Sequence, residues 1–263
     1  MSETIGTVFV KIGGSFLTYK DKPFSINLEA LTKTYRILRR IGDEIKLILG
    51  NGGGSFAHPI VIKYRDRESN KLIVECHRAT RLLNNMLVNY LVNKGLKVTS
   101  IQTSAIIVRD KRDYIVFAEP IIHALDNNII PVVYGECIFS IEKGYEIVST
   151  EKVFELLAKH IKPHHIVLLT DVKGIYSCDP RTCSEAELIK LINRNNLDEI
   201  LDKLKKTEKE DVTGSIYGKV SSMAQLSKEL GIKIYIVSGF NEEEVIKAVL
   251  DRGIEEGTII DLG

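Results

Sequence analysis

Hydrophobic residues in this 263-residue chain occur alternately as short continuous runs and as longer stretches with helical spacing. Apolar runs of about four to eight residues are typical of buried strands, whereas apolar positions three and four residues apart are typical of amphipathic helices. The runs predict strands at 8–12, 45–49, 97–101, 105–108, 114–118, 129–133, 166–170, 233–237 and 258–260. The spaced patterns predict helices at 27–41, 71–94, 119–127, 149–161, 219–230 and 241–251, and a hairpin is predicted at 136–148. This alternation indicates an α/β protein whose parallel sheet is covered on both faces.

The glycine-rich segment Gly52-Gly53-Gly54-Ser55 comes two residues after the predicted strand at 45–49. It precedes a segment that can open a helix. Glycines let the backbone approach a ligand closely. A helix start leaves unpaired N–H groups and the positive end of the helix dipole, so the segment predicts an anion site, most often one for phosphate. His58 lies about one turn into that helix, within reach of an anion held by the glycines.

Lysines accompany two further glycine-containing loops. Lys11 interrupts the strand at 8–12 near its C-terminal end, where ligands bind in open α/β sheets, and Gly13-Gly14-Ser15 follows. A lysine there can also extend to solvent, but its place favours a phosphate contact. The segment Gly214–Lys219 again leads from small residues into a helix. None of these loops matches the P-loop or the dinucleotide fingerprint. Together they fit a site with phosphates at both ends, as phosphoryl transfer requires.

Composition narrows the range of partners. The chain has 36 Lys and Arg against 35 Asp and Glu, which argues against general binding to nucleic acid or to an anionic membrane surface. No apolar run approaches the ~20 residues of a membrane span, and no signal peptide is evident, so we expect a soluble, cytoplasmic protein. Cys178 and Cys183 fit no common zinc spacing, and His164 and His165 lack a third ligand, so we expect ordinary thiols and no metal site.

Four segments, in this order along the chain, resemble the amino acid kinase superfamily. They are Lys11-Ile-Gly-Gly-Ser15, Gly52-Gly-Gly-Ser-Phe-Ala-His58, Thr170-Asp-Val-Lys-Gly-Ile-Tyr176 and Asp211-Val-Thr-Gly-Ser-Ile-Tyr-Gly-Lys219. The histidine of the second segment narrows the resemblance to the isopentenyl phosphate kinase family, whose motif reads Gly-Gly-Gly-Ser-Phe-Gly-His. Fosfomycin kinases resemble the same loop.

The resemblance implies an open three-layer αβα sandwich with a mainly parallel central sheet, formed as a single domain over 1–263. It also implies an acceptor lobe at 1–148 and an ATP-binding lobe at 149–263. The implied reaction is ATP-dependent transfer, with Mg2+, to a small phosphate monoester, foremost isopentenyl phosphate to isopentenyl diphosphate. The alternatives are another phosphate or phosphonate such as fosfomycin, and a non-catalytic nucleotide-binding regulator. The resemblance and the long predicted helix at 71–94 further suggest a homodimer.

The resemblance also assigns roles to individual residues. Catalytic roles fall to Lys11, Lys20, His58, Glu151 and Lys219. Nucleotide contacts fall to Lys11, Gly13, Gly14, Ser15, Gly54, Asp171, Gly174, Tyr176, Gly214 and Lys219. Acceptor contacts fall to Gly53, His58 and Thr150.

The chain departs from the family pattern at a few positions. Thr150-Glu151 replaces the usual Gly-Asp after a serine, so Glu151 would orient the lysines in place of an aspartate. Glu136 stands where aspartate is common, and Ser215 replaces a glycine. A phosphate monoester is already largely dianionic near neutral pH, because its second pKa is about 6, and so it needs no general base. A hydrogen bond from His58 to an acceptor oxygen suits that chemistry.

Overall fold

The computed structural model describes residues 6–43, 45–64, 69–207 and 216–263. Within them, an eight-stranded sheet has the order β10-β12-β11-β9-β1-β2-β6-β3. Its neighbouring strands pair in parallel except for β11 and β12. The strands are β1 (Val8–Ile12), β2 (Leu47–Asn51), β3 (Val98–Ser100), β6 (Ile130–Tyr134), β9 (His165–Thr170), β10 (Leu191–Ile192), β11 (Lys233–Ser238) and β12 (Thr258–Ile260).

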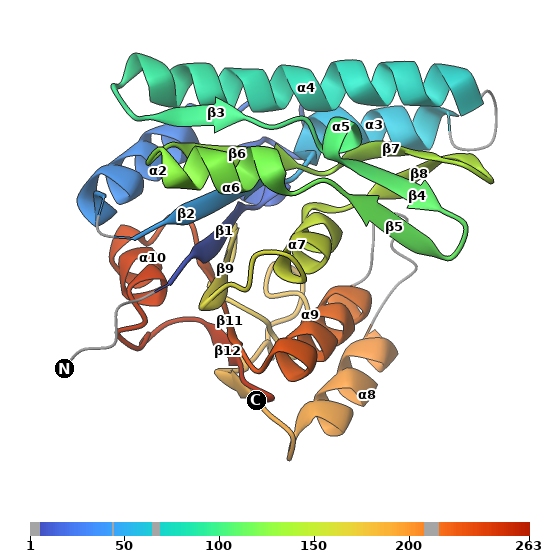
Figure 1. Ribbon diagram of the computed structural model, residues 1–263. Coiled ribbons are helices and arrows are strands. Elements are labelled where there is room, and N and C mark those ends of the chain that lie inside the picture. The colour runs from blue at the N-terminus through green and yellow to red at the C-terminus, as the bar shows by residue number, and fades with distance from the viewer. Residues whose placement is uncertain (1–5, 44, 65–68, 208–215) are drawn as a thin grey trace.

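A second sheet of four strands lies beside the first, in the order β5-β4-β7-β8 (Figure 1). Its strands are β4 (Ile107–Asp110), β5 (Asp113–Val116), β7 (Glu136–Ser140) and β8 (Gly144–Val148). The antiparallel pair β7 and β8 is the hairpin predicted at 136–148.

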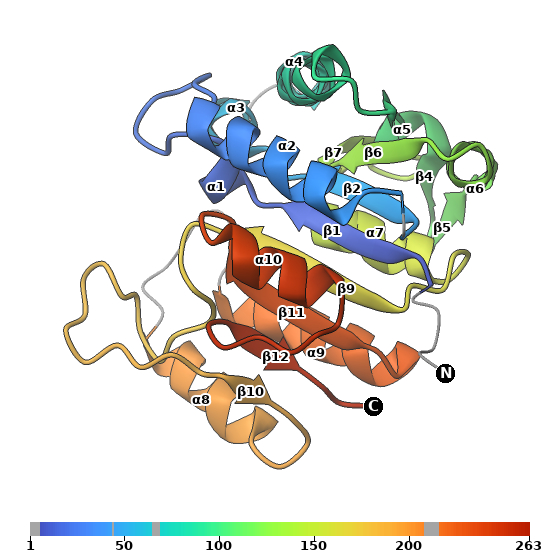
Figure 2. The same cartoon turned by 90° about the vertical axis from the view of Figure 1, so that its left-hand side faces the viewer.

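Helices cover both faces of the large sheet, as Figure 2 shows for α2 and α10 in front and α7 and α9 behind. One face carries α1 (Gly14–Leu17), α2 (Leu28–Ile41), α3 (Gly54–Tyr64), α4 (Ser69–Asn93) and α10 (Glu242–Val249). The other carries α6 (Glu119–Asp126), α7 (Thr150–Ala158), α8 (Leu197–Thr207) and α9 (Ile216–Leu230). The side chains of strand β1 alternate between the two faces. Val8 and Val10 join the core under α1, α2, α3, α4 and α10, whereas Phe9 packs against Phe154 of α7. The predicted three-layer αβα sandwich is confirmed.

Local polar groups fix where the helices begin. The Asn27 side chain accepts hydrogen bonds from two backbone N–H groups at the start of α2, and Ser149 does the same for Lys152 N at the start of α7. Such caps satisfy donors that a helix start leaves unpaired. The Ser149 cap sets the position of Glu151, which matters for the site described below. No described helix has the length and apolar content needed to cross a membrane.

Parts of the prediction were wrong. The strand expected at 105–108 begins instead with a helical turn, α5 (Thr103–Ile106), because the Thr103 hydroxyl donates to the Tyr134 carbonyl oxygen (2.6 Å) and the Ser104 N–H donates to the Glu136 carboxylate (2.8 Å). The charged stretch at 184–206 predicts a weak helix, but the helix begins only at Leu197, after the short strand β10. The charge run at 203–211 predicts a solvated loop, but α8 extends through it to Thr207; residues 208–211 lie outside the described residues.

The expectation of ordinary thiols at Cys178 and Cys183 was also wrong, because the two residues form a disulfide. The free cysteines of the described chain, Cys76 and Cys137, are buried.

Candidate active site

The polar and glycine-rich loops meet at one edge of the large sheet. Strands β9, β1, β2 and β6 are consecutive neighbours, and the register pairs Ile12 with both Leu169 and Asn51, and Asn51 with Tyr134. All four strands therefore end at the same level. Parallel strands place their carboxyl ends together, which is where ligands bind in open α/β sheets.

The loops after β1 and β2 pack backbone against backbone. A Cβ on Gly14 would lie 2.5 Å from the Gly54 nitrogen, and Gly54 itself has φ +46°. Any larger side chain at either position would push the loops apart. The Thr18 hydroxyl joins them further, since it donates to Gly14 O (2.7 Å) and accepts from Ser55 N (2.9 Å). The two glycine loops therefore form one cradle.

The cradle presents backbone donors from two helix starts. Gly13 O accepts from the N–H groups of Phe16 and Leu17, and Gly53 O accepts from those of Phe56 and Ala57. The backbone N–H groups of residues 14, 15, 54 and 55 come before these donors in the chain. They have no acceptor within their own helix. Two such turns placed side by side suit the oxygens of adjoining phosphates.

A pair of charged side chains lies beside the cradle. Lys11, on β1, donates to the carboxylate of Glu151, in the first turn of α7, and both side chains are mostly buried. Burial alone would raise the pKa of the Glu151 carboxyl, but the charge and hydrogen bond of Lys11, together with the charge of Lys219, hold it below its ordinary value. Glu151 therefore stays ionised between two lysines. Lys219 itself is exposed on α9.

A second charged cluster follows β9. Asp171 accepts from the Thr170 hydroxyl (3.2 Å) and pairs with Lys20 (3.4 Å). Burial would raise the pKa of the Asp171 carboxyl, but a hydrogen bond from Ser15 and the charges of Lys20 and Arg181 hold it below its ordinary value. The cluster links the segment after β1 to the loop after β9. The nucleotide contacts expected of these residues stay a prediction.

The predicted acceptor residues lie on the β2 side. Gly53 belongs to the cradle, and His58 is exposed in the first turns of α3. Thr150 is buried, and its hydroxyl donates to Asn51 O (2.7 Å) and accepts from Gly135 N (3.0 Å). This side chain ties α7 to β2 and β6. Its contact with a substrate stays a prediction.

Glu136 is a buried carboxylate at the start of β7. It accepts from Arg81 Nε (3.1 Å) on α4 and from Ser104 N (2.8 Å) on α5. A buried charge is tolerated when it is paired and hydrogen-bonded in this way. The residue thus holds α4 and α5 against the sheet edge.

Two further predicted residues, Gly174 and Tyr176, make structural contacts in the segment after β9. Gly174 packs against β12, because a Cβ there would lie 2.6 Å from Thr258 Oγ1, and Tyr176 forms an isolated bridge with Leu188. Gly214 and Ser215 lie outside the described residues. Among the residues that are described, no group of three or more His, Cys, Asp or Glu side chains could hold a metal ion.

Sequence reasoning missed several supporting residues. Thr18 was missed because a single threonine after a glycine loop carries no motif. Asn51 precedes the glycines directly, and its buried side chain accepts from Asn84 on α4 (2.9 Å). The position of Asn51 between an apolar run and the glycines was the sequence signal that could have identified it.

The model of the amino acid kinase family matches residues 6–238. This chain belongs to the amino acid kinase family. Among relatives, the chain is 32% identical to an isopentenyl phosphate kinase from Methanocaldococcus jannaschii, over 96% of this chain and 97% of that one. It is 28% identical to an isopentenyl phosphate kinase from Thermoplasma acidophilum, with coverage of 90% and 94%.

A further relative and a solved structure match as well. A glutamate 5-kinase from Prochlorococcus marinus is 26% identical and is covered over 69% of its length. Among solved structures, an isopentenyl phosphate kinase in its substrate complex superposes with a TM-score of 0.79 at 25% identity, over 97% of this chain and 99% of that one. The family's fold therefore extends over nearly the whole chain.

Proposed function

We propose that the protein is an isopentenyl phosphate kinase, which transfers the γ-phosphoryl group of ATP to isopentenyl phosphate and yields ADP and isopentenyl diphosphate. The similarity to isopentenyl phosphate kinases over nearly their full lengths supports this acceptor. The observation that carries the reaction type is the Lys11–Glu151 pair, within reach of the Lys219 charge, beside two joined glycine loops.

In this proposal, each group has a role that suits a phosphate acceptor. An acceptor phosphate oxygen forms the new bond to the γ-phosphorus, while the bond to the β,γ-bridging oxygen breaks and ADP leaves. Lys11 and Lys219 balance the charge on the transferred group, and Glu151 keeps them in place. His58 and the Gly53 amide hold the acceptor phosphate, whereas Gly13, Gly14, Ser15 and Gly54 contact the nucleotide phosphates. Lys20 and Asp171 complete the nucleotide side.

The lobe assignment follows the same division. The acceptor lobe is 1–148, with the Gly53 and His58 turn, and the ATP lobe is 149–263, with Asp171, Gly174, Tyr176, Gly214 and Lys219. Mg2+ commonly binds through nucleotide phosphates with few protein ligands. That mode fits the donor set here, since the carboxylates of Glu151 and Asp171 are both paired with cations.

In this proposal, the hydrocarbon tail of the acceptor lies over an apolar patch on β7 and β8. On β7 and β8, Phe139 and Ile147 are half-exposed on the strand face that also carries the buried Cys137. The Phe139 ring packs edge-on against His77 of α4 (centroid distance 5.7 Å). A short isoprenoid tail would cover such side chains and gain from their burial. A compact polar acceptor such as fosfomycin would leave them in water.

We also propose a homodimer that uses the outer face of α4. This face carries the exposed apolar side chains Val74, Leu82, Met86 and Val92, and a second copy of the chain would remove them from water. Light scattering at micromolar concentration should give twice the monomer mass. Leu82→Glu should shift the mass toward the monomer, and a monomeric wild type would contradict the proposal.

Incubation with Mg2+ and ATP tests the function directly. Isopentenyl phosphate, fosfomycin and glutamate are offered separately, and 31P NMR follows the product. A diphosphate signal with isopentenyl phosphate, at a kcat/KM far above the other acceptors, is the expected result. Preference for fosfomycin would replace the proposed acceptor. ATP binding without turnover of any acceptor would favour a nucleotide-binding regulator.

A further inference from the structure

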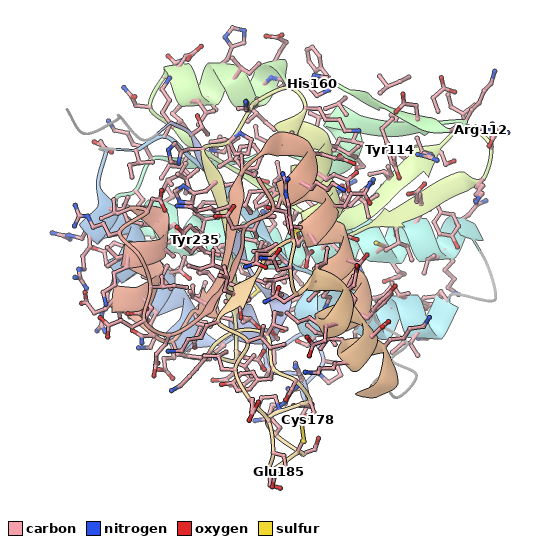
Figure 3. The ribbon with its side chains drawn as sticks, turned by 90° about the horizontal axis from the view of Figure 1, so that it is seen from below. Arg112, Tyr114, His160, Cys178, Glu185 and Tyr235 are labelled. Carbon is pink, nitrogen blue, oxygen red and sulfur yellow. A yellow bond between two sulfur atoms is a disulfide. The ribbon has the colours of Figure 1, made fainter. Side chains whose placement is uncertain are left out.

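The segment that follows the nucleotide-side loop leaves the body of the protein. None of residues 176–190 is buried, and Figure 3 shows Cys178 and Glu185 on a loop that extends away from the sheet. Its two arms are joined where Ser177 N donates to Glu187 O (2.9 Å) and Glu187 N donates to Ser177 Oγ (3.0 Å). Beyond that point no hydrophobic core holds the chain, and the Cys178–Cys183 disulfide closes the turn.

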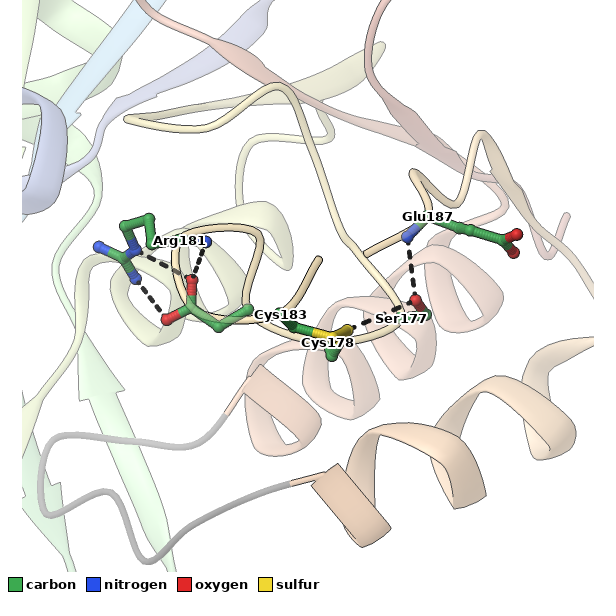
Figure 4. The surroundings of a disulfide bond; sticks show 6 residues. Ser177, Cys178, Arg181, Cys183 and Glu187 are labelled. Carbon is green, nitrogen blue, oxygen red and sulfur yellow. Dashed lines mark hydrogen bonds and ion pairs between the residues drawn. A yellow bond between two sulfur atoms is a disulfide. The ribbon is translucent and has the colours of Figure 1, made fainter. Parts of the chain in front are cut away.

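The closed turn fixes one guanidinium group. Asp179 accepts from Arg181 Nε (3.0 Å), from its Nη2 (3.1 Å) and from its backbone N–H (3.0 Å) (Figure 4). The Asp179 carbonyl oxygen also accepts from Cys183 N (2.9 Å), inside the same turn. A bidentate pair of this kind fixes direction as well as distance. The remaining nitrogen, Nη1, is held 3.4 Å from Asp171 Oδ2.

Arg181 shares that oxygen with a second cation. Lys20 Nζ also lies 3.4 Å from Asp171 Oδ2, and Ser15 of the loop after β1 helps to hold the pKa of Asp171 below its ordinary value. Lys20 and Arg181 are balanced by Asp171 and Asp179, so the four side chains together carry no net charge. Because Arg181 also contacts Asp171, Lys20 is not the sole partner of that carboxylate and remains available to a polyphosphate.

We propose that the disulfide-closed turn 178–183 is a redox-sensitive positioning element of the nucleotide site. The bond keeps Arg181 on Asp171, and thereby keeps Lys20 available to the polyphosphate of a nucleoside triphosphate. This inference rests on the proposed function only in placing a nucleotide at this edge of the sheet. Once the bond is reduced, the turn opens, Arg181 withdraws, Asp171 pairs with Lys20 alone, and affinity for the polyphosphate falls.

The reduction is a two-electron step. A dithiol supplies two electrons and two protons, the Sγ–Sγ bond breaks, two thiols form on Cys178 and Cys183, and the dithiol becomes a cyclic disulfide. Both cysteines are partly exposed, and exposed disulfides are the more readily reduced ones.

Direct titration with Mg2+–ATP, without acceptor, tests the inference on the oxidised and the dithiothreitol-reduced protein. Reduction should raise the Kd about three- to fivefold, as expected for the loss of one partly exposed charge contact, and more at low ionic strength. Arg181→Ala should raise it equally, and reduction of that variant should add nothing. Arg181→Lys should recover part of the affinity. Arg112→Ala, which removes the same charge at the opposite end of the molecule (Figure 3), should change nothing.

The double variant Cys178→Ser/Cys183→Ser should bind like the reduced protein and should not respond to reductant. An unchanged Kd on reduction would overturn the inference. A reduced protein with a lower melting temperature but an unchanged Kd for Mg2+–ATP would also overturn it, because the bond would then serve stability alone. Redox-sensitive ATP binding in a protein that does not phosphorylate isopentenyl phosphate would leave the inference standing and remove the proposed acceptor. Absence of ATP binding would overturn both.

Discussion

Lys11 and Glu151 lie 140 residues apart in the chain and form an ion pair where β1 meets the first turn of α7. The family commonly has an aspartate at the second position, and the extra methylene of glutamate still lets the carboxylate reach the lysine. The Glu151 carboxylate thus holds the Lys11 ammonium group through an ion pair, and its charge also attracts Lys219.

Glu151→Gln should therefore slow phosphoryl transfer. We expect kcat to fall about tenfold to a hundredfold, because misplaced lysines lose alignment with the transferred group, while the Kd for ATP changes little. Steady-state kinetics with a parallel nucleotide titration measure both. Glu155→Gln, one turn further along α7, is the matched control and removes only an ion pair with Lys152. Full activity of Glu151→Gln would reduce Glu151 to a carboxylate that stabilises the helix N-terminus.

Lys219→Ala should lower kcat by about a hundredfold, because its charge would act on the transferred phosphoryl group. The side chain is exposed on α9, so the melting temperature should stay within error of the wild type. Lys228→Ala, an exposed lysine on the same helix, controls for the general loss of charge. Unchanged turnover would remove Lys219 from the mechanism.

His58→Ala should lower kcat/KM for the phosphorylated acceptor about ten- to a hundredfold, the usual effect of losing a charge-assisted hydrogen bond. His58→Gln should recover part of the loss, because an amide still donates. ATP affinity should hardly change, since the proposed nucleotide position is on the other side of the cradle. The exposed His123 on α6 provides a control alanine variant. A lower melting temperature with intact kinetics would instead give His58 a structural role.

His165 should make folding stability depend on pH. Burial lowers its pKa from 6.5 to about 4, with Asp251 opposing and His164 adding to the shift, and its Nε2 has no hydrogen-bond partner among the described residues. The unfolded chain binds this proton more tightly than the folded one, so stability falls as the pH drops from 6.5 toward 4. The loss at pH 4 is about 3 kcal/mol.

Urea unfolding of the wild type and of His165→Phe at pH 7 and pH 4 measures this contribution. On going from pH 7 to pH 4, the wild type should lose about 3 kcal/mol more free energy of unfolding than the variant does. His160→Phe replaces an exposed histidine and should follow the wild type. Parallel behaviour of His165→Phe and the wild type would show that His165 titrates normally in the folded state.

The elements that sequence predicted well are those with strong local signals. The apolar run at 166–170 has little alternative to a buried strand, and it is β9. The glycines at 52–54 could be recognised because three consecutive glycines after an apolar run are a strong local signal. Lys11 was predicted from its place at the end of a strand, whereas its partner Glu151 was expected only through the resemblance. The two residues meet by chain topology, which residue spacing does not encode.

One of the errors has its physical origin in a long-range contact. The turn at Thr103 depends on the carbonyl of Tyr134, a residue 31 positions away, and no local pattern contains that partner. Cys178 and Cys183 were weighed against zinc spacings, whereas a short exposed turn without a core favours a crosslink. Sequence reasoning did not single out Arg181, which the closed turn places beside Asp171.

The contact between Gly14 and Gly54 has a mechanical consequence. With peptide backbones touching and the Thr18 hydroxyl bonded to both sides, neither loop can swing without carrying the other along. Donor and acceptor phosphates would therefore rest on a single rigid platform whose spacing is built in before either ligand arrives. Entry and departure of substrates must then depend on movement of the surrounding segments, while the distance between the two reacting groups stays the same from one turnover to the next.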